Sequence, residues 1–203
     1  MNTFAQKCNT IFMQAVVDYH HTDSVDTPIN NPYPALTIEN LLYLKCWIDT
    51  VQWHLEDIIR DPNINPVEAL AIKRRIDRSN QERTDLVERI DSYFYEQYSN
   101  TKPQPEAKIN TESPAWAIDR LSILNVKIYH MQVEADRTDV SKEQHLEVEK
   151  KLAVLKEQQT DLTTSITQLL DDYSSGIRIM KVYKQMKMYN DPNLNPVLYK
   201  QSK

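Results

Sequence analysis

Apolar residues recur at spacings of three and four along most of this chain, with polar residues between them. This is the period of an amphipathic α-helix, in which one face is buried and the other meets water. The pattern predicts six helices, over residues 3–20, 37–60, 66–98, 114–138, 141–173 and 177–189.

The predicted helix ends coincide with residues that cap helices. Thr37 is suited to the N-cap of the second helix, and Asn65 precedes a proline at the first position of the third. Ser141 stands three residues before Gln144, which is the spacing of a capping box. Gly176 follows the fifth helix, where glycine commonly ends a helix.

Two stretches eighty residues apart share one pattern. Ile38-Glu39-Asn40-Leu41 corresponds to Ile118-Asp119-Arg120-Leu121, and the Thr-Asp-Leu of 84–86 recurs at 160–162. A duplicated helical hairpin cannot cover its own apolar face, so it packs against its copy. We therefore predict an all-α fold, a helical bundle of two related long helical hairpins with an N-terminal helix and a short basic C-terminal helix.

The chain is long enough for one sizeable core, and we predict a single domain over 1–203. Its parts are hairpin repeat one (37–98), a linker (99–113), hairpin repeat two (114–173) and the C-terminal helix and tail (177–203). The composition of the linker is typical of a flexible connection.

Composition excludes several classes of function. A single glycine, Gly176, leaves no glycine-rich loop that could hold a phosphate or a dinucleotide, and no cofactor is predicted. The two cysteines lack metal-binding spacing, which favours a reducing compartment. The N-terminus does not have the pattern of a signal peptide, and no apolar stretch is long enough to cross a bilayer. We expect a cytoplasmic protein.

The net charge of −5 is unevenly distributed. Residues 177–203 carry a net +5, which leaves −10 on residues 1–176. An acidic body argues against nucleic-acid binding, so we predict no nucleic-acid partner. Over 177–189, apolar and basic residues alternate at helical spacing. This helix either closes the bundle or contacts an anionic membrane surface or a protein partner.

Polar residues interrupt the apolar faces of all four long helices at equivalent positions. Burying a polar group without a partner costs about 1–3 kcal/mol, so these groups must meet each other, water or a ligand. The candidate ligand-binding residues are Lys45, Asp49, Gln52, Glu56, Asn80, Arg83, Asn125, Gln132 and Gln159.

Two interpretations of these residues remain open. In the first, they form a structural polar layer in which Arg83 pairs with Asp49 or Glu56. In the second, they line a pocket where Lys45 and Arg83 receive the anionic group of a small metabolite. The first hairpin bears the charges and the second supplies neutral amides, so such a site would belong mainly to the first hairpin.

The sequence does not decide whether the protein is an enzyme. Glu88-x-x-Asp91 resembles an acidic motif of the all-helical nucleotide pyrophosphohydrolases, but the matching Glu-x-x-Glu is absent from the preceding helix. The resemblance implies, as an alternative, a metal-dependent phosphohydrolase using Asp49, Glu56, Asp57 and Asp91.

Two sets of residues could contribute to a metal site, namely His54 with Asp57 and Asp61, and His130 with Glu134. His54 lies away from the apolar stripe, and His20 precedes a loop without an evident partner in the pattern. His130 has only Glu134 near it on the same helix. We therefore expect partly packed or exposed histidines and no bound metal.

Two blocks resemble a known family. Residues 114–128 (PAWAIDRLSILNVKI) and 47–77 (WIDTVQWHLEDIIRDPNINPVEALAIKRRID) are similar to an uncharacterised bacterial family of about this length, a domain of unknown function found mainly in Bacteroidetes-type genomes. The resemblance implies a cytoplasmic helper of envelope polysaccharide or lipopolysaccharide synthesis, and it brings no catalytic residues. The Pro-Gly usual in the second block is Pro114-Ala115 here, which puts any close backbone approach there in doubt.

Overall fold

The computed structural model describes residues 2–189 and 191–200, and within these ranges the protein contains six helices and no strand. The prediction of an all-α fold is confirmed. The helices are α1 (Phe4–His20), α2 (Ile38–Ile59), α3 (Pro66–Tyr98), α4 (Pro114–Ala135), α5 (Lys142–Ser174) and α6 (Pro196–Tyr199).

The long helices begin at the capping residues that the sequence indicates. The Thr37 hydroxyl accepts a hydrogen bond from the backbone N–H of Asn40 at 3.2 Å. The Asn65 side chain accepts one from Val67 N–H at 2.8 Å. These contacts satisfy backbone donors that the first turn of a helix leaves unpaired.

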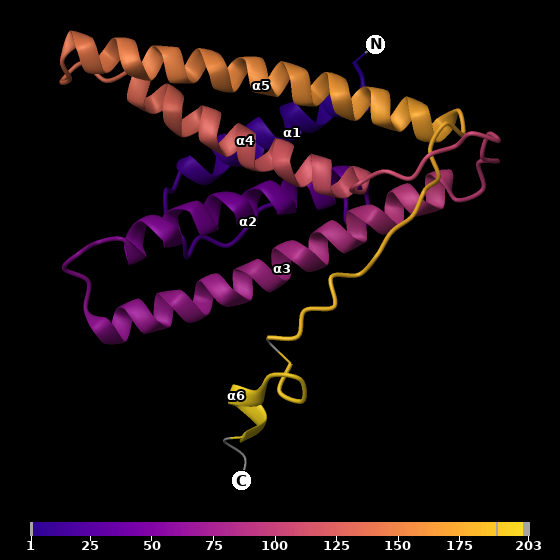
Figure 1. Ribbon diagram of the computed structural model, residues 1–203. Helices are drawn as coiled ribbons and strands as arrows, with labels where there is room; N and C mark the ends of the chain where they lie inside the picture. Colours follow the sequence, from indigo (N-terminus) through magenta and orange to yellow (C-terminus); the bar gives the residue numbers. More distant parts are fainter. Residues whose placement is uncertain (1, 190, 201–203) are drawn as a thin grey trace.

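Helices α2 and α4 each contain 22 residues, and α3 and α5 each contain 33. Helix α2 packs against α3, and α4 packs against α5. Figure 1 shows these two long hairpins one above the other, with α1 lying between them. Because α1 contacts α2, α4 and α5, it fills the space that neither hairpin closes alone.

The main core lies where α1 meets both hairpins. It is built from the buried faces of the five long helices, and aromatic side chains occupy much of it. Its largest fully buried apolar side chains include Phe12, Tyr19, Tyr43, Phe94 and Tyr173. A smaller cluster of Leu124, Ile128, Ala135 and Leu152 lies between the far ends of α4 and α5.

The predicted helix over 177–189 is wrong, because this segment is extended. Gly176 adopts a φ of +73°, and a Cβ atom there would lie 2.5 Å from the carbonyl oxygen of Lys102. Beyond this turn, Ile177 O accepts from Lys108 N–H and Ile179 N–H donates to Lys108 O, both at 3.0 Å. The linker over 99–113 therefore takes the backbone groups that a helix would need.

The extended segment continues along α3, where Figure 1 shows it as a trace leaving the end of α5. The backbone N–H of Gln185 donates to Glu88 at 3.0 Å, and Lys187 Nζ donates to Asn80 O at 3.0 Å. The membrane-surface interpretation of 177–189 required an amphipathic helix, so it loses its structural basis. None of the helices in the described ranges has the length and apolar character needed to span a membrane.

Candidate functional site

Lys45 lies at the centre of a buried ion cluster. Its side chain is fully buried, and its ammonium nitrogen lies 2.5 Å from Asp49 Oδ2 and 2.7 Å from Asp119 Oδ1. Asp49 is on the same helix one turn away, whereas Asp119 comes from α4. The sequence pattern places Asp119 in hairpin repeat two but does not mark it as a site residue.

Arg83 completes the cluster from α3. Its Nε donates to Asp49 Oδ1 at 2.6 Å, and the Ser122 hydroxyl donates to Asp49 Oδ2 at 2.6 Å. The four charged side chains, including Lys45 and Asp119, carry two positive and two negative charges. Since an unpaired charge is very unfavourable in a protein interior, this balance lets the cluster remain buried.

Three neutral side chains extend the cluster between α2 and α3. The Gln52 amide nitrogen donates to Asn80 Oδ1 at 2.9 Å, and the Ser79 hydroxyl donates to Gln52 Oε1 at 2.9 Å. The first hairpin thus brings together Lys45 and Asp49 with the polar groups that the sequence placed on the facing helix.

A second polar network joins the other hairpin to α1. Asn125 is fully buried, donates to Asn9 Oδ1 at 2.8 Å, and accepts from Gln159 at 2.9 Å. Asn9 in turn donates to the Thr163 hydroxyl at 2.8 Å. Asn9 and Thr163 were not predicted, because the pattern of α4 and α5 contains no information about how α1 packs on them.

Two of the predicted residues lie at the edges of these networks. Gln132 donates to Asp136 on its own helix at 2.9 Å and accepts from the exposed Lys156 at 3.0 Å. Glu56 pairs with Arg60 at 3.3 Å, one turn further along α2. Both lie within one turn of the end of their helix, and both are only partly buried.

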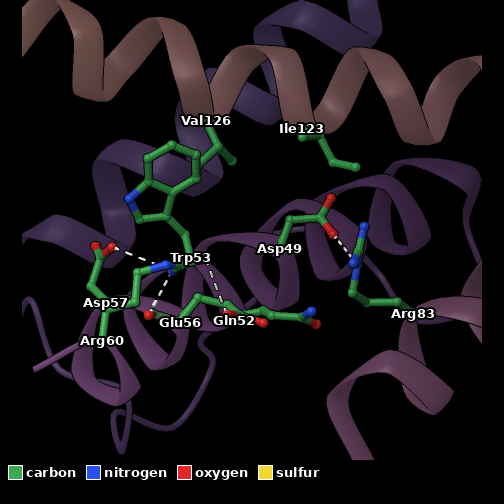
Figure 2. Close-up of a pocket in the computed structure, with 9 residues that line it drawn as sticks. All are labelled: Asp49, Gln52, Trp53, Glu56, Asp57, Arg60, Arg83, Ile123 and Val126. Carbon is green, nitrogen blue, oxygen red and sulfur yellow. Dashed lines mark hydrogen bonds and ion pairs between the residues drawn. The ribbon is translucent and has the colours of Figure 1, made fainter. Parts of the chain in front are cut away.

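A pocket of about 380 Å³ lies beside the ion cluster, between α2, α3 and α4. Figure 2 shows Arg83 next to Asp49 on one side of it, and Arg60 next to Asp57 on the other. The Trp53 indole stands beside Val126 and gives the pocket an apolar wall. The pocket is lined by Asp49, Gln52, Trp53, Glu56, Asp57, Arg60, Arg83, Ile123 and Val126.

Residues 39–182 match the family described as protein of unknown function (DUF4254). The chain belongs to the DUF4254 family. The family resemblance of the two sequence blocks is thereby confirmed. Neither the curated proteins nor the solved structures contain a match. The DUF4254 match includes the ion cluster and the pocket, and it excludes α1 with Asn9.

Of the four carboxylates proposed for a phosphohydrolase, Asp49, Glu56 and Asp57 line the pocket described above, but Asp91 lies apart from them. Asp49 is occupied by two cations and a hydroxyl, whereas Asp91 accepts a hydrogen bond from Ser113 at 2.9 Å beside a different pocket. Over 2–189 and 191–200, these carboxylates form no group of three with the spacing of metal ligands. The carboxylate set therefore does not support the enzyme alternative.

The histidines, in contrast, do meet, although the sequence pattern indicates no partner for His20 and groups His54 and His130 only with nearby acidic residues. His20, His54 and His130 come from α1, α2 and α4 and place one ring nitrogen each within 4.8 Å of the others. One sequence signal could have revealed them. Each of the three histidines comes directly after an aromatic residue in the sequence, in Tyr19-His20, Trp53-His54 and Tyr129-His130.

Proposed function

We propose that this protein is a binding protein that holds the anionic group of a small molecule on Arg83, in the pocket beside the ion cluster. One observation carries the proposal. Arg83 lines the pocket with its Nε fixed by Asp49, while its terminal nitrogens make only long contacts in the described part of the chain. These are 3.5 Å to Asn80 Oδ1 and 3.6 Å to Asp119.

A guanidinium group has five N–H donors in a fixed plane, and it binds carboxylate or phosphate oxygens through two parallel hydrogen bonds. Asp49 orients the plane, which reduces the entropy that Arg83 loses when it binds an anion. The terminal N–H groups of Arg83 then bind the oxygen atoms of the anion. This is the second of the two interpretations that the sequence left open, with Lys45 in a supporting position because Asp49 and Asp119 already surround it.

The size and lining of the pocket support a small ligand with an apolar body. Its volume of about 380 Å³ lies near the lower end of typical ligand sites, which span roughly 300–1,000 Å³. Trp53 and Val126 offer the apolar wall, while Glu56 and Asp57 lie on the rim and contact Arg60 at 3.3 and 4.0 Å. Three carboxylates and two arginines line the pocket, and this net negative charge favours one compact anionic group over a chain of phosphates, because like charges repel.

A charge-removing substitution tests the proposal. Thermal shift and titration calorimetry would be run in EDTA with inorganic phosphate, a sugar monophosphate and a sugar nucleotide as probes. We expect stabilisation of the wild-type protein by at least one probe, and a loss of about 10–100-fold in affinity in Arg83→Met, since hydrogen bonds to charged groups contribute about 1.5–3 kcal/mol.

Arg89→Met is the matched control, because Arg89 lies exposed on the same helix. It should bind as the wild type does. Unchanged binding in Arg83→Met, or a more stable Arg83→Met protein that keeps every interaction, would identify the cluster as scaffold only.

The biological setting belongs to the same proposal. The family resemblance supports a cytoplasmic accessory role in bacterial envelope polysaccharide or lipopolysaccharide synthesis, with a protein partner as the other candidate for what it binds. A glycosyltransferase gene beside this one would support that setting.

A further inference from the structure

Three histidine side chains from three helices converge at one end of α1. His20 is the last residue of α1, and it faces His54 of α2 and His130 of α4. Within 2–189 and 191–200, they are the only group of three or more histidine, cysteine or acidic residues whose ligand atoms all lie within 4.8 Å of one another. Their helices also contact one another pairwise, so the group is held by the bundle itself.

The spacing within the group suits a metal ion. The Nε2 atoms of His20 and His54 lie 3.2 Å apart. A tetrahedral zinc ion with Zn–N bonds of 2.0–2.1 Å places two ligand nitrogens about 3.3 Å from each other. The two rings therefore already stand at the separation of two ligands on one ion.

Hydrogen bonding fixes the orientation of the His20 ring. Its Nδ1 lies 2.6 Å from the carbonyl oxygen of Val16, which can only accept, so Nδ1 carries the proton. In the neutral ring the lone pair is then on Nε2, where it accepts a hydrogen bond from His54 Nε2–H at 3.2 Å, and a bound ion would replace that proton. A ligating histidine that donates its other N–H to a backbone carbonyl is the usual arrangement around protein-bound metals.

His130 provides an independent observation. Its Nε2 atom is buried and has no hydrogen-bond partner in the described part of the chain. A buried polar atom without a partner is rare in folded proteins, and a bound ion or water is one explanation for it. Burial also lowers the pKa of the His54 ring and lowers that of His130 to about 4, which favours the neutral form of both imidazoles. Neutral imidazole is the form that binds metal.

Each ring is stacked on an aromatic residue from a different helix. Tyr129 packs on His20 with centroids 4.2 Å apart, and Trp53 packs on His130 at 4.7 Å with planes 6° apart. Tyr19 stacks on His54 at 5.1 Å. The aromatic residue before each histidine thus holds a histidine of another helix, and this positions all three rings before an ion arrives.

Asp23 lies beside two of the three rings, with its side chain 63% exposed. Its Oδ1 lies 4.0 Å from His20 Nε2 and 3.8 Å from His54 Nε2. The residue has a φ of 49°, in the left-handed region that aspartate and asparagine tolerate better than most residues. This backbone conformation turns the chain after α1 back towards the histidines.

We propose that His20, His54 and His130 bind one divalent transition-metal ion of the zinc type, with Asp23 at the fourth position. Three imidazoles and one carboxylate form a tetrahedral donor set that selects zinc or cobalt over magnesium, which prefers oxygen ligands. The ion links α1 to both hairpins. Because Trp53 also lines the pocket, the site adjoins the proposed ligand site without sharing a charged residue with it.

The full-length protein, freed of metal by chelation, provides the test. Calorimetry and thermal shift with zinc, cobalt and magnesium should give one zinc or cobalt ion per chain, a higher Tm with either, and no response to magnesium. Bound cobalt should show the intense visible absorption of a tetrahedral site. A spectrum like that of aqueous cobalt would overturn the proposal even if every variant failed to fold.

Single substitutions locate the ion. His20→Gln, His54→Gln and His130→Gln should each weaken zinc binding by more than about 100-fold, since even outer-shell partners contribute about 10–100-fold. Asp23→Asn, which keeps the backbone conformation, should weaken it by at least about tenfold. His145→Gln, on α5 with its side chain 40% exposed and away from the three histidines, is the matched control and should bind as the wild type does.

The two proposals fail separately. Arg83→Met should keep zinc binding, and His54→Gln should keep the response to anionic probes. Zinc binding that persists in all three histidine variants would contradict the metal site and leave the Arg83 site unaffected.

Discussion

Asp91 is a buried carboxyl group that is only partly satisfied. It is 4% exposed, and its Oδ2 accepts a hydrogen bond from Ser113 at the start of α4. Its Oδ1 has no partner in the described part of the chain. Burial raises the pKa of Asp91, and the hydrogen bonds from Ser113 and from the backbone of Ala115 only partly oppose this.

Asp91 should therefore make stability depend on pH. Above the ordinary aspartate pKa of about 3.9, the unfolded chain ionises before the folded chain does, so stability falls as pH rises towards the raised pKa of Asp91. Asp91→Asn keeps an acceptor for Ser113 and removes the ionisation. We expect the variant to gain stability relative to the wild type as pH rises from about 4 to 7.

Urea unfolding at a series of pH values measures this difference. Asp161→Asn, at an exposed position on α5, is the comparison. A stability difference between Asp91→Asn and the wild type that stays constant over the whole pH series would contradict the assignment.

At the level of residues, contacts between near neighbours in the chain could be predicted from the sequence. The capping hydrogen bonds of Thr37 and Asn65 join residues at most three positions apart, so the local sequence contains all that they require. Asp119 is different. Its partner Lys45 is 74 positions away, and only the contact between α2 and α4 shows that the two share a buried site.

At the level of elements, Lys45 ties α2 to α4 through Asp119. Lys45→Met would leave Asp49 and Asp119 with only Arg83 as a cation, and breaking a buried ion pair costs about 3–5 kcal/mol. The double variant Lys45→Met/Asp119→Asn also loses the negative charge of Asp119, so Asp49 and Arg83 remain as a balanced pair. We expect the double variant to lose less stability than the sum of its two single variants.

A double-mutant cycle by urea unfolding measures the coupling, which should reach about 0.5–3 kcal/mol for groups in contact. Lys127→Met, at an exposed position of α4, should change the free energy of unfolding little. Additive losses from Lys45→Met and Asp119→Asn would show that the two charges do not depend on each other.

The helix predicted over 177–189 shows that hydrophobic periodicity alone can predict the wrong secondary structure. Its apolar and basic residues do alternate at helical spacing, but an isolated helix of this length is marginal in water. The backbone of Lys108 offers hydrogen bonds to Ile177 and Ile179 instead. Competition from a segment about seventy residues away in the sequence cannot be read from the local pattern.

At the level of the whole molecule, the two apolar clusters should differ in stability. The main core draws on all five long helices, whereas the Leu152 cluster joins only α4 and α5. A region with fewer buried contacts opens at lower free energy. A leucine-to-alanine truncation costs about 2–5 kcal/mol at a well-packed position. We predict that Leu152→Ala lowers the free energy of local opening mainly at this end of the second hairpin.

Hydrogen exchange followed by mass spectrometry would locate the effect. Leu152→Ala should accelerate exchange in the second half of α4 and the first half of α5, with little change in α1 and α2. Leu170→Ala, on the same helix but in the main core, should accelerate exchange throughout. Equal and global acceleration by both would mean that the bundle opens as one unit.

The sequence by itself determined the helices from α1 to α5, their starts, and the placement of polar residues on buried faces, because period and capping act over a few residues. Only the tertiary structure decided which polar groups meet. It joined Lys45 to Asp119, Asn125 to Asn9, and three histidines to one another. These contacts depend on how α1 and the two hairpins pack, and the energy of that packing is shared by residues far apart in the chain.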